Sequence, residues 1–143
     1  MKEKLVFMTR FFCGIVLVMG LMSVFPQFSW AQEESSPIQV ELGFGTGIDR
    51  ETRGLTGQSE TFAAGIERVF CRMHITGATA PTTVNHVWYR DGKTMAQVEL
   101  NVGSANWRTW SSKRLLPSWT GFWEVKVLDQ TGKVLASASF EIN

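Results

Sequence analysis

Stretches in which apolar and polar residues alternate recur along most of this chain. Between residues 69 and 75 every second position is apolar, namely Val69, Cys71, Met73 and Ile75. A repeat of two is the spacing of a β-strand that buries one face, and no window shows the sustained repeat of an amphipathic helix. The pattern therefore predicts an all-β protein.

Turn signals separate the alternating stretches. Asp91-Gly92 is a hairpin signal between two such stretches, and Asp129 to Gly132 marks another turn. About seven short strands over roughly 105 residues are typical of an antiparallel immunoglobulin-like β-sandwich. The predicted strands are residues 38–44, 69–75, 84–90, 94–102, 107–113, 123–127 and 134–142.

One long stretch lacks this alternation. Residues 46–61 contain only Ile48 and Leu55 as large apolar side chains. A stretch of this length without its own pattern predicts a long, mobile connection, and such loops are often functional or disordered.

The beginning of the chain has the pattern of a secretory signal peptide. Lys2, Lys4 and Arg10 precede an uncharged apolar run at 11–25, and the small residues Ser29 and Ala31 follow a breaker. A basic start, a short apolar run and small residues at positions −3 and −1 predict cleavage after Ala31.

This prediction divides the chain into a signal peptide at 1–31, a polar spacer at 32–37 and a β-sandwich domain at 38–143. The alternative is an uncleaved membrane anchor, but a spanning helix needs about 20 apolar residues and Arg10 interrupts any longer run. We therefore expect a periplasmic or secreted protein with no membrane span after cleavage.

Composition narrows the functional classes. The 143 residues are 44% hydrophobic and 19% charged, which is too apolar for a disordered chain. The chain has 14 basic and 13 acidic residues. Cleavage would remove three basic residues and one acidic residue, and it would leave 11 basic and 12 acidic residues. A slightly acidic exported domain is not expected to bind nucleic acid.

Few side chains are suited to catalysis or to metal binding. After cleavage Cys71 is the one remaining cysteine, and it accompanies His74 and His86 without Cys-x-x-Cys or His-x-x-x-His spacing. Cys71 is in phase with apolar residues, which favours a buried thiol. We expect a non-enzymatic protein without metal or cofactor. The alternative is a Cys/His enzyme that uses Cys71 and His86.

The strand at 84–90 presents two different faces. His86, Trp88 and Arg90 share one face, and Val87 and Tyr89 share the other, so the pattern does not decide which face is buried. Immunoglobulin-like sandwiches often bury a tryptophan on the corresponding strand. On that analogy Trp88 is in the core and His86 lies at its margin; the alternative is a His86 that faces a ligand.

The segment from Trp107 to Arg114 combines aromatic and basic residues. Flat aromatic faces stack on sugar rings or peptide side chains, while Arg and Ser orient hydroxyls or carboxylates. The alternative is structural, with a tryptophan closing one end of the sandwich and Arg108 bracing a loop. The predicted ligand-binding patch consists of Trp107, Arg108, Trp110, Ser111, Lys113, Trp119 and His86.

Several short motifs in this order resemble a bacterial family known as domain of unknown function 2914. The resemblance extends from about Val40 to Ile142 and implies no activity, so it assigns no catalytic residue. The motifs are Phe70-Cys71, His86-Val87-Trp88, Trp107 to Ser111, Gly121-Phe122-Trp123 and Phe140-Glu141-Ile142.

These observations lead to two functional hypotheses besides the Cys/His enzyme. The first is an exported binding module that recognises an envelope glycan or a protein partner by stacking and charge-assisted hydrogen bonds. The second is a structural or assembly protein of the envelope, in which an exposed sheet edge or the strand at 38–44 pairs with a partner.

Overall fold

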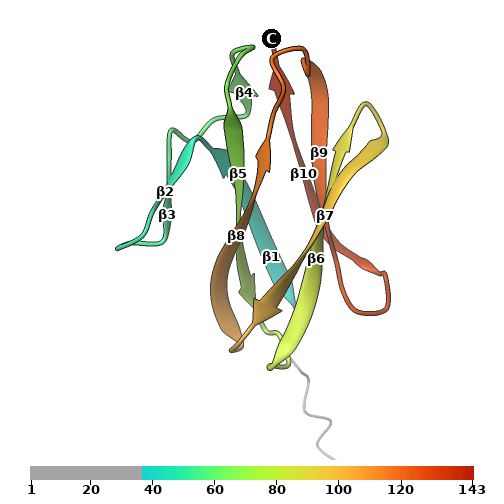
Figure 1. The fold of residues 1–143 in the computed structure, drawn as a ribbon. Helices are drawn as coiled ribbons and strands as arrows, with labels where there is room; N and C mark the ends of the chain where they lie inside the picture. The colour runs from blue at the N-terminus through green and yellow to red at the C-terminus, as the bar shows by residue number, and fades with distance from the viewer. Residues whose placement is uncertain (1–36) are drawn as a thin grey trace, which may run out of the picture. The chain divides into compact units, whose positions relative to one another are not determined.

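The computed structural model describes residues 37–143, and this part of the chain contains ten β-strands and no helix (Figure 1). The strands are β1 (Gln39–Gly45), β2 (Gly47–Asp49), β3 (Gly54–Thr56), β4 (Thr61–Phe62), β5 (Arg68–Thr76), β6 (Thr82–Arg90), β7 (Lys93–Val102), β8 (Asn106–Arg114), β9 (Gly121–Leu128) and β10 (Val134–Ile142).

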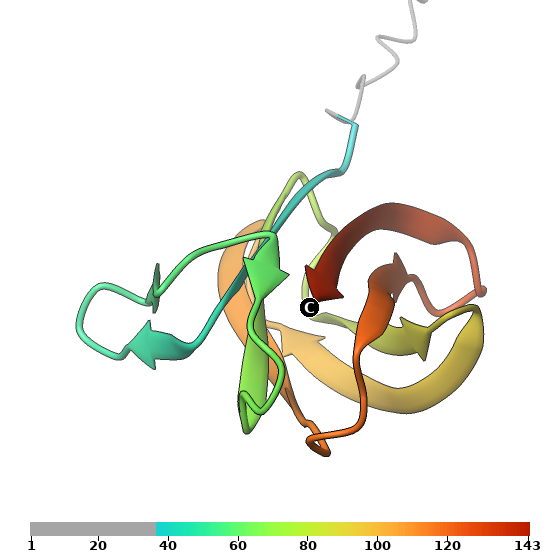
Figure 2. The same cartoon turned by 90° about the horizontal axis from the view of Figure 1, so that it is seen from above.

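Two sheets face one another across a shared core, as both views show (Figures 1 and 2). The smaller sheet has the order β1-β5-β8 and the larger has β4-β10-β9-β6-β7. All of these pairings are antiparallel except that of β4 with β10. The predicted antiparallel immunoglobulin-like sandwich is therefore confirmed, with ten strands where the sequence predicts about seven.

The extra strands come from the segment at 46–61. It was expected to be a long mobile connection, but it forms the β2–β3 hairpin and leads into β4. Ile48 lies opposite Leu55 in this hairpin. The Asp49 carboxylate closes its turn by accepting hydrogen bonds from the backbone N–H of Glu51 at 2.9 Å and of Thr52 at 3.3 Å. These contacts are local, so a sequence with only two large apolar residues still forms a hairpin.

A glycine brings the hairpin close to β1. A Cβ atom on Gly45 would lie 2.6 Å from the carbonyl oxygen of Thr56, which is closer than side-chain carbons approach backbone. The hairpin therefore depends on the missing side chain at this position. Beyond this contact the hairpin projects from the sandwich, as seen from above (Figure 2).

The alternation predicted along β5 and β9 is the one that the structure buries. Val69, Cys71 and Met73 of β5 point inward with no exposed surface, as do Trp123 and Val125 of β9. β5 and β9 belong to different sheets, so their apolar faces meet in the middle of the sandwich. This arrangement supplies the main hydrophobic stabilisation of the fold.

Phe140 lies at the centre of the aromatic part of the core. Its ring stacks on Trp123 with centroids 5.9 Å apart and meets the edge of Trp88 at 6.2 Å. Phe44 contributes a further ring at 4.7 Å. These rings come from β1, β6, β9 and β10 and therefore join the two sheets.

The predicted signal peptide and nearly all of the polar spacer lie outside the described residues. Among residues 37–143, none forms a helix of the length and hydrophobicity that a bilayer span requires.

Candidate functional site

The tryptophans and charged residues that the predicted patch places on β8 point to both sides of this strand. Ser111 lies opposite Cys71 in the register with β5, so the side chains in phase with it, including Trp107, face the inside of the sandwich. Arg108 and Trp110 lie out of phase with Ser111 and face outward. Trp107 and Trp110 therefore lie on different sides of the strand.

A groove forms where the edge of β8 meets the edge of β7. Its volume is about 590 Å³, and the tip of the β2–β3 hairpin contributes part of its wall. We call it the arginine groove, and it is lined by Arg50, Arg53, Glu99, Leu100, Asn101, Trp107, Arg108, Thr109 and Trp110.

The structure thus brings together part of the predicted patch. Trp107, Arg108 and Trp110 line one groove because adjacent residues of an edge strand can reach it from either face. Arg50 and Arg53 join them from the hairpin, and sequence reasoning missed both. The available signal was Asp49, a residue type that favours turns, in the stretch between the single apolar residues Ile48 and Leu55.

Two other residues of the predicted patch lie elsewhere. The Lys113 ammonium lies 5.3 Å from the ring centroid of Trp119. Trp119 is half-buried and packs against Trp123, with ring centroids 6.1 Å apart. Neither Lys113 nor Trp119 lines the arginine groove. This pair instead closes the core near the start of β9, which is the structural role weighed for a tryptophan of this region.

The last two predicted residues, Ser111 and His86, are buried. The Ser111 hydroxyl lies 2.8 Å from Nδ1 of His86 and accepts a hydrogen bond from Nε1 of Trp88 at 3.1 Å. His86 has no exposed surface and Ser111 is 5% exposed. A ligand at the surface of this structure does not reach either side chain. His86 lies inside the core with Trp88, and Val87 on the opposite face is also buried.

Burial controls the protonation of His86. Its Nε2 atom is buried and has no hydrogen-bond partner among the described residues. Loss of hydration disfavours the imidazolium and lowers the pKa of His86 from 6.5 to about 4. The ring is therefore neutral at physiological pH, and it can accept the Ser111 hydroxyl hydrogen at Nδ1.

Cys71 lies opposite Ser111 and is also inaccessible. Its side chain has no exposed surface, and burial alone raises its pKa to about 12. A nucleophilic cysteine needs a thiolate and access to substrate. This environment provides neither of them.

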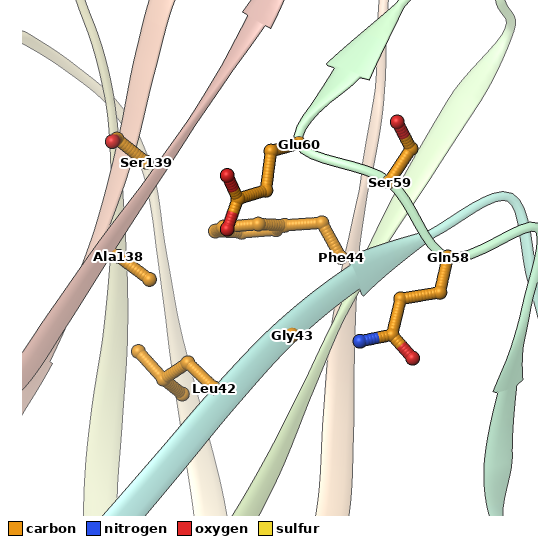
Figure 3. A pocket seen from close by; sticks show the side chains of 8 residues that line it. All are labelled: Leu42, Gly43, Phe44, Gln58, Ser59, Glu60, Ala138 and Ser139. Atoms are coloured by element: carbon orange, nitrogen blue, oxygen red, sulfur yellow. The ribbon is translucent and has the colours of Figure 1, made fainter.

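A second depression lies between the two sheets, on the side where β1 faces β10 (Figure 3). It has a volume of about 370 Å³. We call it the β1–β10 pocket; its walls are Leu42, Gly43, Phe44, Gln58, Ser59, Glu60, Ala138 and Ser139.

Backbone groups of β1 point toward the β1–β10 pocket. The carbonyl of Phe44 accepts a hydrogen bond from the Ser59 backbone N–H at 3.1 Å, so Phe44 directs its backbone groups away from β5. In an antiparallel ladder every second residue does the same, which places the N–H and C=O of Val40 and Leu42 on this edge. Among residues 37–143, β5 is the only strand that pairs with β1.

Comparison with known families finds one match. Residues 81–142 match the family described as "Protein of unknown function (DUF2914)". The matched segment contains every motif on which the resemblance was based except Phe70-Cys71. The resemblance predicted from those motifs is confirmed over residues 81–142, and no curated protein matches the chain.

Two solved structures show weak similarity. The crystal structure of β-glucosidase from Listeria innocua in complex with glucose has a TM-score of 0.44 and 8% identity. The match covers 76% of this chain and 16% of that chain. The crystal structure of β-glucosidase from Listeria innocua has a TM-score of 0.38 and 9% identity, covering 75% of this chain and 16% of that one.

The burial of Cys71 predicts that the native protein resists alkylation there. Iodoacetamide should modify Cys71 only after the domain is unfolded, because the thiol is both covered and protonated. Peptide mapping by mass spectrometry in the presence and absence of denaturant measures this. Rapid modification of Cys71 in the native protein would contradict the prediction and revive the Cys/His enzyme.

The lowered pKa of His86 predicts a loss of stability in mild acid. In the unfolded chain its pKa returns to about 6.5, so between pH 6.5 and about 4 the unfolded state binds a proton that the folded state does not. The free energy of unfolding should therefore fall as the pH drops through this window, by at most about 3 kcal/mol.

Denaturant unfolding of matched variants isolates this effect. The slope assigned to His86 should be absent in His86→Gln and retained in His74→Gln, which alters the partly buried histidine of β5. Carboxylates contribute equally to all three proteins, so the difference between wild type and His86→Gln is the quantity to measure. If the difference in free energy of unfolding between wild type and His86→Gln stays constant from pH 6.5 to about 4, His86 does not titrate as described.

Proposed function

We propose that this chain, whose residues 81–142 match the DUF2914 family, is a non-enzymatic binding module of the bacterial cell envelope. It recognises a glycan or a protein partner at the arginine groove. The observation that carries this proposal is the convergence of Trp107, Arg108 and Trp110 on one open groove.

The groove supplies two kinds of contact to a ligand. The indole faces of Trp107 and Trp110 offer flat apolar surface on which a sugar ring or an apolar side chain stacks. The Arg108 guanidinium donates charge-assisted hydrogen bonds, which orient the stacked group. Both contacts form without bond breaking, so the proposed mechanism is recognition alone.

The proposed location rests on the sequence of residues 1–31. The basic start, short apolar run and small residues before Gln32 are the features that direct a protein to export. A periplasmic or secreted protein meets envelope glycans and the exposed parts of envelope proteins. This location therefore fits a groove with stacking and hydrogen-bonding side chains.

Replacement of Trp110 should separate binding from folding. Trp110 is half-buried on the outer face, so Trp110→Ala should weaken binding about tenfold or more with little loss of stability. Binding is measured by quenching of tryptophan fluorescence with isolated cell-wall and polysaccharide fractions, and folding by denaturant unfolding.

Trp119→Ala is the matched control. It also removes a half-buried indole but lies outside the arginine groove, so it should leave the affinity unchanged. If Trp119→Ala abolishes binding and Trp110→Ala does not, the recognition surface is the Lys113–Trp119 pair and the proposed groove is wrong.

A second candidate function, assembly by strand addition, is favoured by the β1–β10 pocket. The unpaired edge of β1 lines this pocket at Leu42, and Ser139 lies on its other wall (Figure 3). An extended partner segment laid along β1 would form the missing ladder of backbone hydrogen bonds. Apolar contacts with Leu42 and Phe44 would then select its side chains.

Site-specific cross-linking in cells tests this second function. A benzoylphenylalanine at the exposed Ser139 should form an adduct with one envelope protein, because this position lines the pocket. The same group at Thr94, which is exposed on β7, should not form it. Equal adducts at both positions, or none at Ser139, would argue against strand addition.

A further inference from the structure

Positive charge is concentrated in the arginine groove although the chain as a whole is nearly neutral. Arg50, Arg53 and Arg108 line the groove against a single carboxylate, that of Glu99. None of the three arginines forms an ion pair with another residue in the part of the chain that the structure describes. Three like charges that face one counter-charge leave a net positive potential in the groove, which attracts an anion.

A fourth guanidinium lies beside the groove. Arg72 of β5 is directly opposite Trp110 of β8 in the sheet register. Its Nε atom is buried and has no hydrogen-bond partner among residues 37–143. An unpaired buried donor next to Trp110 strengthens the preference of this surface for negative charge.

We propose that the ligand of the arginine groove is an acidic glycan, and this rests on the proposed function. Its carboxylate or sulfate groups bind Arg50, Arg53 and Arg108, and a sugar ring stacks on Trp107 or Trp110. Guanidinium groups match carboxylates and sulfates with paired hydrogen bonds, which a neutral sugar does not offer. Asn101 and Thr109 add polar side chains that suit sugar hydroxyls.

The β2–β3 hairpin completes this site. It supplies two of the three groove arginines, Arg50 and Arg53, whereas Arg108 comes from β8. The hairpin is held near β1 by the close approach of Gly45 to Thr56. Displacement of the hairpin should therefore remove anion binding and leave the groove tryptophans in place.

Binding of two matched pairs of glycans to the purified protein tests the charge requirement. The first pair is oligogalacturonate and its methyl ester, and the second is dextran sulfate and dextran. Isothermal titration calorimetry should show binding of at least one charged member and, for its neutral partner, affinity lower by about tenfold or more. Raising the NaCl concentration from about 50 mM to about 500 mM should weaken the charged complex about tenfold.

Variants of the hairpin locate the charge. Arg50→Ala with Arg53→Ala should weaken binding of the charged glycan about tenfold or more. Lys93→Ala with Lys133→Ala removes the same charge from exposed positions next to two turns and should have no effect. Gly45→Ala, whose new Cβ displaces the hairpin, should reproduce the loss without removing an arginine, with folding checked by circular dichroism.

The remaining outcomes overturn the inference in distinguishable ways. If charged and neutral glycans bind equally and Trp110→Ala weakens both, the groove binds glycans but the acidic specificity is wrong. If neither pair binds, the acidic glycan is wrong; the Trp110→Ala test on envelope fractions then decides whether the groove functions at all. If a single-stranded oligodeoxynucleotide binds more tightly than either charged glycan, the polyanion is not a glycan.

Discussion

The buried hydroxyl of Ser111 is the polar contact that fixes how the two sheets meet. It comes from β8 of the smaller sheet and bonds His86 and Trp88 of β6 in the larger sheet. Apolar contacts are tolerant of small shifts, whereas a buried hydrogen bond is lost when its partners move apart. The register between β8 and β6 is therefore specified here, beside the covered thiol of Cys71.

The position of the arginine groove follows from this contact. With Ser111 turned into the core, the alternation of β8 directs Arg108 and Trp110 outward and leaves Trp107 at the edge near β7. The groove walls thus belong to rigid strands. Only Arg50 and Arg53 are carried by a projecting hairpin, so two of the three groove arginines lie outside the two packed sheets.

Sequence reasoning identified the groove tryptophans, but it also placed residues in the same patch that lie outside the groove. It grouped Ser111, Lys113 and Trp119 with Trp107 and Trp110 because they are close along the chain. In a strand, neighbours in sequence point to opposite faces, and the loop after β8 carries Trp119 back onto Trp123. Proximity in sequence is therefore a poor guide to a surface built on a strand, and Arg50, far away in sequence, lines the groove instead.

The alternation of apolar residues by itself determined the β-sandwich, most strand positions and the inward face of β5, because a period of two leaves one face to bury. The order of short motifs also predicted the family match found at residues 81–142. Only the tertiary structure decided that His86 lies in the core and that the arginines of the hairpin at 46–61 meet Trp110. These features depend on contacts between segments distant in the chain, and no local pattern encodes the energy of such contacts.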